Sequence, residues 1–111
     1  MSYNILPTHR FEKELKRLVK KFPSLKSEFG ELISELLKKP ESGVFLGNNC
    51  YKIRLSIASK GKGKSGGARV ITYLYLSAKV VYLLTIYDKS EKEDLKQNEL
   101  LEMIGSLELE N

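Results

Sequence analysis

The sequence predicts an α+β domain, with a small antiparallel sheet, a helical hairpin near the N-terminus and one C-terminal helix. Apolar residues recur at helical spacing between residues 8 and 40, and they alternate with a period of two between residues 50 and 87. A turn of only three residues separates the last two strand patterns, which favours antiparallel pairing. The expected order is therefore β-α-α-β-β-β-α, in one domain of residues 1–111.

The first expected elements are an edge strand and two amphipathic helices. Residues 3–6 have the strand pattern, and Pro7 closes it because proline cannot donate to a sheet ladder. Thr8 is the expected N-cap of the first helix, and Ser24 is that of the second. Pro23 separates the two helices, so they are expected to form a hairpin.

Three strands are expected after a loop of residues 41–49. Their patterns cover residues 50–57, 68–76 and 80–87. Alternation places Lys52 and Arg54 on one face of the first strand, about 7 Å apart. Arg69 opens the second strand. The third strand is apolar on both faces, which is typical of a strand inside a sheet.

The last expected element is a helix that begins near the end of the third strand. Ser90 and Glu93 have the spacing of a capping box, so the helix is expected to begin there. Gly105 is expected to end it as a left-handed residue after the last turn.

The positive charge of the chain is concentrated in its middle. The net charge is +5, yet seven cations and no acidic residue lie between residues 50 and 87, which leaves −2 for the rest of the chain. These cations are Lys52, Arg54, Lys60, Lys62, Lys64, Arg69 and Lys79. Such a localised excess is typical of a surface that binds a polyanion.

Single cysteine and histidine residues exclude several kinds of site. Cys50 is the only cysteine, so neither an internal disulfide nor a cysteine metal cluster is possible, and a reducing cytoplasm fits. His9 is the only histidine, which excludes a pair of histidines for acid–base catalysis. No apolar run approaches the length of a membrane span.

Residues 58–65 match the relaxed pattern of a nucleotide-binding phosphate loop. That motif requires a helix directly after it, because the N–H groups of the helix hold the phosphates. Here Gly66, Gly67 and a strand pattern follow instead. The segment is therefore interpreted as a flexible basic loop, in which Lys60, Lys62 and Lys64 contact an RNA backbone; a hairpin loop that lysines keep soluble is the alternative.

Tyrosines provide a second possible contact with nucleic acid. Tyr73 and Tyr75 share the face of Arg69 and could stack on bases, although packing in the core is the simpler role. Tyr87, at the end of the last strand, could stack on a base, donate a proton or pack.

Three segments together resemble the RelE/ParE superfamily of bacterial toxins, and most closely its RelE/HigB branch. They are residues 51–54 (YKIR), 64–73 (KSGGARVITY) and 84–90 (LTIYDKS). The resemblance implies a RelE-like microbial RNase fold and the toxin of a type II toxin–antitoxin system. Its implied activity is a ribosome-dependent endoribonuclease that cleaves mRNA in the A site and needs no metal or other cofactor.

The resemblance also implies partners and a location. The expected partners are mRNA, the A site of the small ribosomal subunit with its ribosomal RNA, and a cognate antitoxin, typically a helix-turn-helix DNA-binding protein. Operator DNA would be contacted only through that antitoxin. The expected location is the cytoplasm.

Several site residues follow from the resemblance, position by position. Lys52 and Arg54 match two basic residues of the family's second strand, and Arg69 matches the arginine that opens the next strand. Lys89 lies where RelE has a basic residue after the fourth strand.

One family residue has no match in this chain. The C-terminal tyrosine that helps to activate the attacking hydroxyl in RelE corresponds to a position near Leu95. Tyr87 or a lysine is a candidate replacement.

These residues suit attack by a 2′-hydroxyl on the adjacent phosphate. Arg54 and Arg69 are expected to stabilise negative charge in the transition state. Lys52 and Lys89 are expected to act in acid–base catalysis, because clustered cations lower one another's pKa.

Two other functions stay open from the sequence. A ParE-like toxin would inhibit DNA gyrase through protein binding, without catalysis. A non-catalytic nucleic-acid-binding domain would show salt-sensitive binding without cleavage.

Overall fold

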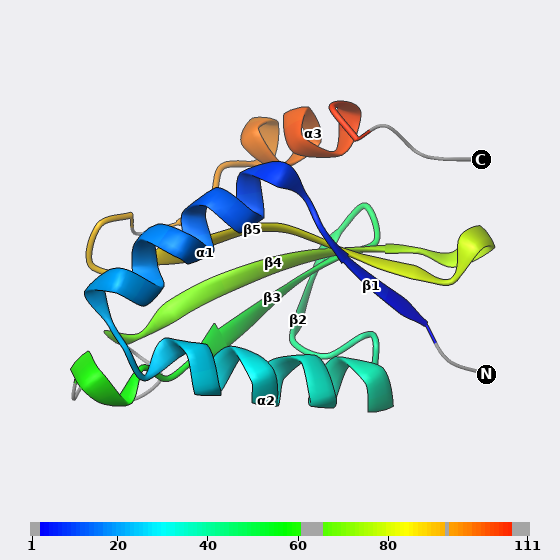
Figure 1. The fold of residues 1–111 in the computed structure, drawn as a ribbon. Coiled ribbons are helices and arrows are strands. Elements are labelled where there is room, and N and C mark those ends of the chain that lie inside the picture. Colours follow the sequence, from blue (N-terminus) through cyan, green and yellow to red (C-terminus); the bar gives the residue numbers. More distant parts are fainter. Residues whose placement is uncertain (1–2, 61–65, 93, 108–111) are drawn as a thin grey trace.

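A five-stranded sheet separates two helices on one face from a single helix on the other in the computed structural model (Figure 1). The structure describes residues 3–60, 66–92 and 94–107. The strands are β1 (Asn4–Pro7), β2 (Val44–Gly47), β3 (Cys50–Leu55), β4 (Ala68–Tyr75) and β5 (Val80–Asp88). The helices are α1 (His9–Lys21), α2 (Leu25–Lys38) and α3 (Gln97–Gly105), with short 3-10 turns at Ala58–Lys60 and Leu76–Ala78.

The strands lie in the order β1-β5-β4-β3-β2, and all neighbours are antiparallel except β1 and β5, which run parallel. Strand β1 is therefore an edge strand, as predicted. The prediction of a loop over residues 41–49 is wrong, because Val44–Gly47 pairs with β3 as the opposite edge strand. Asn48 and Asn49 both have positive φ, which is the geometry of a tight hairpin turn between these strands.

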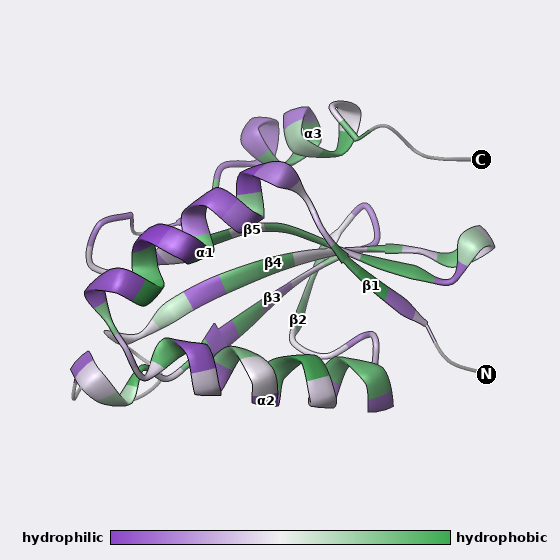
Figure 2. Cartoon of the chain, in the orientation of Figure 1, coloured by the Kyte–Doolittle hydropathy of each residue, from purple (hydrophilic) through white to green (hydrophobic). Residues whose placement is uncertain are grey.

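Two apolar clusters hold the layers together. The larger one lies between the sheet and helices α1 and α2, and the smaller one lies between the sheet and α3. Every residue of β5 is buried, which confirms its prediction as an interior strand, and Figure 2 shows β5 in an almost continuous apolar colour. None of the helices within the described ranges is long and apolar enough to cross a membrane.

The two predicted N-caps differ in the structure. The Thr8 hydroxyl accepts a hydrogen bond from the backbone N–H of Phe11 at 3.1 Å, as predicted. Ser24 occupies the cap position of α2, but its hydroxyl makes no capping bond. It lies instead 2.6 Å from the hydroxyl of Ser59, so it joins α2 to the segment after β3.

The predicted start and end of the last helix are both wrong. The N–H and hydroxyl of Ser90 both donate to the Asp88 carboxylate, which fixes a turn where the helix was expected. Helix α3 begins only at Gln97, and Glu93 lies outside the described residues. Gly105 is the last residue of the helix and has no positive φ, so it is not a left-handed cap.

Gly67 is a point of close backbone approach at the start of β4. A Cβ atom at this position would overlap the carbonyl oxygen of Leu55 on the neighbouring strand. The Gly67 carbonyl also accepts a hydrogen bond from the N–H of Lys89 at 3.0 Å. Gly67 therefore holds together the ends of β3, β4 and β5. Gly30, within α2, has open space around it.

We predict that Gly67→Ala lowers the free energy of unfolding by about 2 kcal/mol, because the new methyl group forces the strands apart. The matched control Gly30→Ala is expected to raise it by about 0.5–1 kcal/mol, since alanine favours a helix interior. Urea unfolding of the two variants tests this, and equal effects would contradict the close packing at Gly67.

Candidate RNA-cleavage site

The pairing of three strands places Arg54, Arg69 and Tyr87 side by side. Arg54 on β3 is opposite Arg69 on β4, and Arg69 is opposite Tyr87 on β5. Directly paired residues have Cβ atoms about 5 Å apart. These three residues, here called the arginine row, lie on the face of the sheet that carries α3, as the predicted alternation requires.

Exposure rises along the arginine row from β5 to β3. Tyr87 is 7% exposed and Arg69 is 4% exposed, whereas Arg54 is exposed to solvent. The Arg69 guanidinium donates to the carbonyl of Ala68 at 3.1 Å. Like charges on directly paired residues destabilise a sheet, so an anion bound beside Arg54 and Arg69 would offset their repulsion.

Lys52 and Asp94 extend the cluster next to the arginine row. Lys52 lies on the same face as Arg54, and its Nζ is 3.6 Å from Oδ1 of Asp94. The N–H of Leu95 lowers the pKa of Asp94 below its ordinary value, and the charges of Lys52 and Lys89 lower it further. Lys89 therefore belongs to the same cluster.

Asp94 was not predicted from the sequence as a site residue. It lies 42 positions after Lys52, and only the folded chain brings the two together. The one local signal is its position just after Lys89 and Lys92, in the short segment before α3.

Tyr87 is stabilised in its neutral, protonated form. Burial raises the pKa of its hydroxyl, the charges of Asp94 and Glu99 raise it too, and only Arg69 acts in the opposite direction. The hydroxyl oxygen is buried and has no hydrogen-bond partner among the described residues. Tyr87 thus keeps its proton at neutral pH.

The predicted docking lysines lie in a different environment. Lys60 is only 7% exposed, and its Nζ contacts the Asp88 carboxylate at 2.5 Å and the Ser90 hydroxyl at 3.3 Å. Lys62 and Lys64 lie outside the described residues, so docking by the three lysines stays a prediction. Strand β4 begins at Ala68, which confirms the prediction that a strand follows the apparent phosphate-loop pattern.

Cys50 and three tyrosines of the sheet pack in the apolar cluster on the α3 side. Burial raises the pKa of the Cys50 thiol to about 12, so it is not a thiolate nucleophile at neutral pH. The rings of Tyr73, Tyr75 and Tyr82 lie with centroids 6.4 Å apart and pack on the α3 side of the sheet. Across the described ranges, no three His, Cys, Asp or Glu side chains form a group that could hold a metal ion.

Comparisons with known proteins identify the family of this chain. The family described as the RelE toxin of the RelE/RelB toxin–antitoxin system matches residues 9–105. The chain belongs to the RelE toxin family. The resemblance predicted from the three sequence segments is therefore confirmed, and the chain is a toxin of a toxin–antitoxin system.

Solved structures share the fold of this RelE-family chain. The isolated E. coli RelE toxin has 19% identity over 95% of this chain and 99% of its own, with a TM-score of 0.60. The intact E. coli RelBE toxin–antitoxin complex has 21% identity, covering 78% and 95%, with a TM-score of 0.58. A double arginine-to-alanine mutant of E. coli RelE with an antitoxin RelBc peptide has 22% identity, covering 87% and 98%, with a TM-score of 0.60. The α+β prediction is confirmed.

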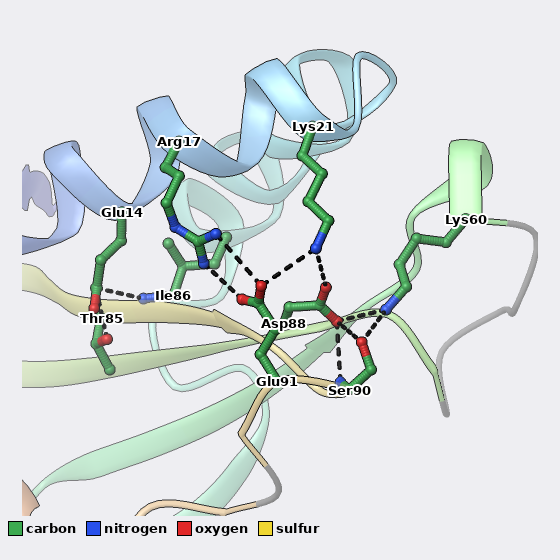
Figure 3. A network of polar contacts seen from close by, with 9 residues as sticks. All are labelled: Glu14, Arg17, Lys21, Lys60, Thr85, Ile86, Asp88, Ser90 and Glu91. Carbon is green, nitrogen blue, oxygen red and sulfur yellow. Dashed lines mark hydrogen bonds and ion pairs between the residues drawn. The ribbon is translucent and has the colours of Figure 1, made fainter.

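Behind the arginine row, the RelE-family chain has a network of ion pairs centred on Asp88 (Figure 3). Asp88 is 1% exposed and lies between the Lys60 ammonium and Lys21 of α1, whose Nζ is 3.8 Å from it. Figure 3 shows Glu91 beside Asp88, where it binds Arg17 at 2.6 Å and Lys21 at 3.2 Å. The network joins α1, the end of β5 and the residues that precede the basic loop.

A second contact fixes α1 along β5. Glu14 accepts hydrogen bonds from the Thr85 hydroxyl at 2.6 Å and from the Ile86 N–H at 3.2 Å (Figure 3). The carboxylate thereby satisfies two polar groups in the strand that leads to Tyr87. The catalytic candidates on the other face of β5 therefore rest on a strand that is held in place over several residues.

We predict that Asp88→Asn lowers the free energy of unfolding by about 3 kcal/mol, because it leaves the buried Lys60 ammonium without its counter-charge. Glu91→Gln is the control and should cost much less, since its partners are largely exposed to water. Urea unfolding measures both. A loss for Asp88→Asn no larger than that for Glu91→Gln would contradict the buried pair.

Stability should also depend on pH through Asp88. Burial alone would raise the pKa of this carboxyl, but hydrogen bonds from Lys60 and Ser90 outweigh burial and hold it below 3.8. The stabilisation is then present above the unfolded-state pKa and is lost as pH falls through the folded-state pKa. Unfolding curves below about pH 4 should therefore show a smaller acid loss in Asp88→Asn than in the wild type.

Proposed function

We propose that this RelE-family toxin is a ribosome-dependent, metal-independent endoribonuclease that cleaves mRNA in the A site. The arginine row is the observation that carries the proposal. It sets two guanidinium groups beside a tyrosine that retains its proton, with Lys52 and Lys89 adjacent. A phosphodiester under attack needs such a set of cations and proton-transfer groups.

In the proposed reaction, a ribose 2′-hydroxyl attacks the adjacent phosphorus. Negative charge develops on the phosphoryl oxygens, and Arg54 and Arg69 stabilise it through charge-assisted hydrogen bonds. The buried Arg69 is fixed by its strand and by the carbonyl of Ala68, so it requires little reorganisation as the charge develops. Arg54, which is exposed, binds the RNA from the solvent side.

Departure of the 5′-oxygen requires a proton. Tyr87 is the proposed donor, since burial keeps its hydroxyl protonated and Arg69 beside it stabilises the phenolate that forms. Lys52 and Lys89 are proposed to assist proton transfer and to neutralise the RNA backbone. Lys60, Lys62 and Lys64 are proposed to dock RNA, with Lys60 limited by its pair with Asp88.

A cognate antitoxin is the proposed protein partner. The solved RelBE complex and the RelE mutant with an antitoxin peptide support this for a chain of the same family and fold. An acidic or amphipathic antitoxin segment that covered Arg54 would block access to the arginine row. The toxin is proposed to contact operator DNA only through a DNA-binding antitoxin. Its proposed location is the cytoplasm.

We predict that Arg69→Ala and Arg54→Ala each lower the rate of mRNA cleavage in programmed ribosomes by at least about 100-fold, as expected for loss of a transition-state donor. Arg10→Ala is the control. It removes an exposed arginine that pairs with Glu14 on α1, so the rate should stay near that of the wild type. Primer extension on the mRNA measures the cleavage.

The same assay separates the competing functions. If the wild type inhibited gyrase supercoiling and left mRNA intact, the toxin would be a ParE-like gyrase inhibitor. If it bound nucleic acid in a salt-dependent way without cleavage or growth arrest, the non-catalytic alternative would hold. Equal cleavage by the wild type and Arg69→Ala would remove the arginine row from the mechanism.

A further inference from the structure

Asp94 provides a carboxylate at the edge of the basic cluster, which consists of Arg54, Arg69, Lys52 and Lys89. Its Oδ1 accepts a hydrogen bond from the N–H of Leu95 at 2.9 Å and lies 3.6 Å from Nζ of Lys52. The side chain is 72% exposed to solvent. The carboxylate is thus held in place through Oδ1 and remains largely accessible to a ligand from solvent.

Glu99, the other carboxylate that acts on Tyr87, is arranged differently. Its two oxygens are occupied by Nζ of Lys92 at 2.5 Å and by the N–H of Lys96 at 3.0 Å. Glu99 therefore belongs to the start of α3, where it stabilises the helix. Asp94 is the better placed of the two to accept a proton from a bound molecule.

We propose that Asp94 is the general base that removes the proton from the attacking 2′-hydroxyl, an assignment that rests on the proposed ribonuclease function. The Asp94 carboxylate takes the 2′-hydroxyl proton while O2′ forms a bond to phosphorus. The bond from phosphorus to O5′ breaks, and O5′ takes the Tyr87 proton. The products are a 2′,3′-cyclic phosphate and a 5′-hydroxyl, and solvent then returns Asp94 and Tyr87 to their starting states.

Asp94 suits this role better than the lysines next to it. A lysine must first lose a proton, against an ordinary pKa of about 10.4, whereas a carboxylate is ionised at neutral pH. The groups that face Asp94 are Lys52 from β3, Lys89 and Tyr87 from β5 and its end, and the Leu95 N–H. The Leu95 N–H, Lys52 and Lys89 lower the pKa of Asp94 while burial raises that of Tyr87, so at neutral pH the carboxyl is ionised and the phenol keeps its proton.

The assignment also accounts for the missing tyrosine. The sequence near Leu95 offers no tyrosine to activate the nucleophile, yet Asp94 is the residue immediately before it. The carboxylate thus occupies the part of the chain from which the activating group was expected, and it lies 3.6 Å from Lys52, which shares a face of β3 with Arg54.

The test compares Asp94→Asn, Asp94→Glu and Asp94→Ala in single-turnover cleavage of mRNA by programmed ribosomes. Asp94→Asn should cleave at least about 100-fold more slowly, and Asp94→Glu should stay within about tenfold of the wild type. Ribosome binding should change by less than about twofold, because the side chain is mostly exposed and lies outside the arginine row. Glu102→Gln, on the exposed part of α3, is the matched control and should behave as the wild type.

Two readouts distinguish a base from a structural residue. Added formate should restore cleavage by Asp94→Ala in a dose-dependent way, while chloride at equal ionic strength should not. The residual rate of Asp94→Asn should rise about tenfold per pH unit near neutrality, because hydroxide replaces the base, whereas the wild-type rate should stay nearly flat.

The outcomes separate the two proposals. Cleavage by the wild type together with a rate for Asp94→Asn within about threefold of it would overturn the role of Asp94 and leave the ribonuclease function standing. A slow Asp94→Asn variant, with no formate rescue of Asp94→Ala and an unchanged pH profile, would also overturn the role of Asp94. Absence of cleavage by the wild type would overturn the ribonuclease function and the role of Asp94 together.

Discussion

The register of three antiparallel strands is the constraint on which this molecule depends. It sets Arg54 beside Arg69 and Arg69 beside Tyr87, although β3 and β5 are not neighbours in the sheet. A slip of one residue would turn these side chains to the opposite face and bring apolar residues into the site. Apolar clusters on both faces of the sheet oppose such a slip. The free energy of packing in these clusters therefore offsets the repulsion between the two paired arginines.

Consecutive residues at the end of β5 divide the work between the two faces. Tyr87 and Lys89 contribute to the basic cluster, whereas the buried Asp88 between them binds Lys60 and Lys21 on the side of α1. The carbonyl of Gly67 fixes the backbone of Lys89 from the neighbouring strand. One face therefore provides the structural ion pairs, and the other presents the candidate catalytic groups. The alternation of a β-strand is sufficient to produce this division.

Local patterns predicted much of the fold and the placement of those candidate site residues that lie within strands. Alternation alone predicted that Lys52 and Arg54 share one face of β3. The helical pattern after Thr8 predicted that Thr8 caps α1. Strand β2 escaped prediction because it has only four residues and ends in a glycine, so its pattern is too short to recognise.

Contacts between distant segments were beyond the reach of local patterns. Lys60 pairs with Asp88, 28 positions away, and Lys52 meets Asp94 only through the turn that precedes α3. The sequence pattern of Ser90 and Glu93 matched a capping box, but the Asp88 carboxylate captured both donors of Ser90. Helix α3 begins instead at Gln97, where Lys96 and Glu99 form the capping box.

The end groups of mRNA exposed to the wild-type toxin on programmed ribosomes test the central claim most directly. If the arginine row supports attack by the 2′-hydroxyl, cleavage within the A-site codon should leave a 2′,3′-cyclic phosphate on the upstream fragment and a 5′-hydroxyl on the downstream fragment. Intact mRNA, or fragments that carry a 5′-phosphate, would contradict it.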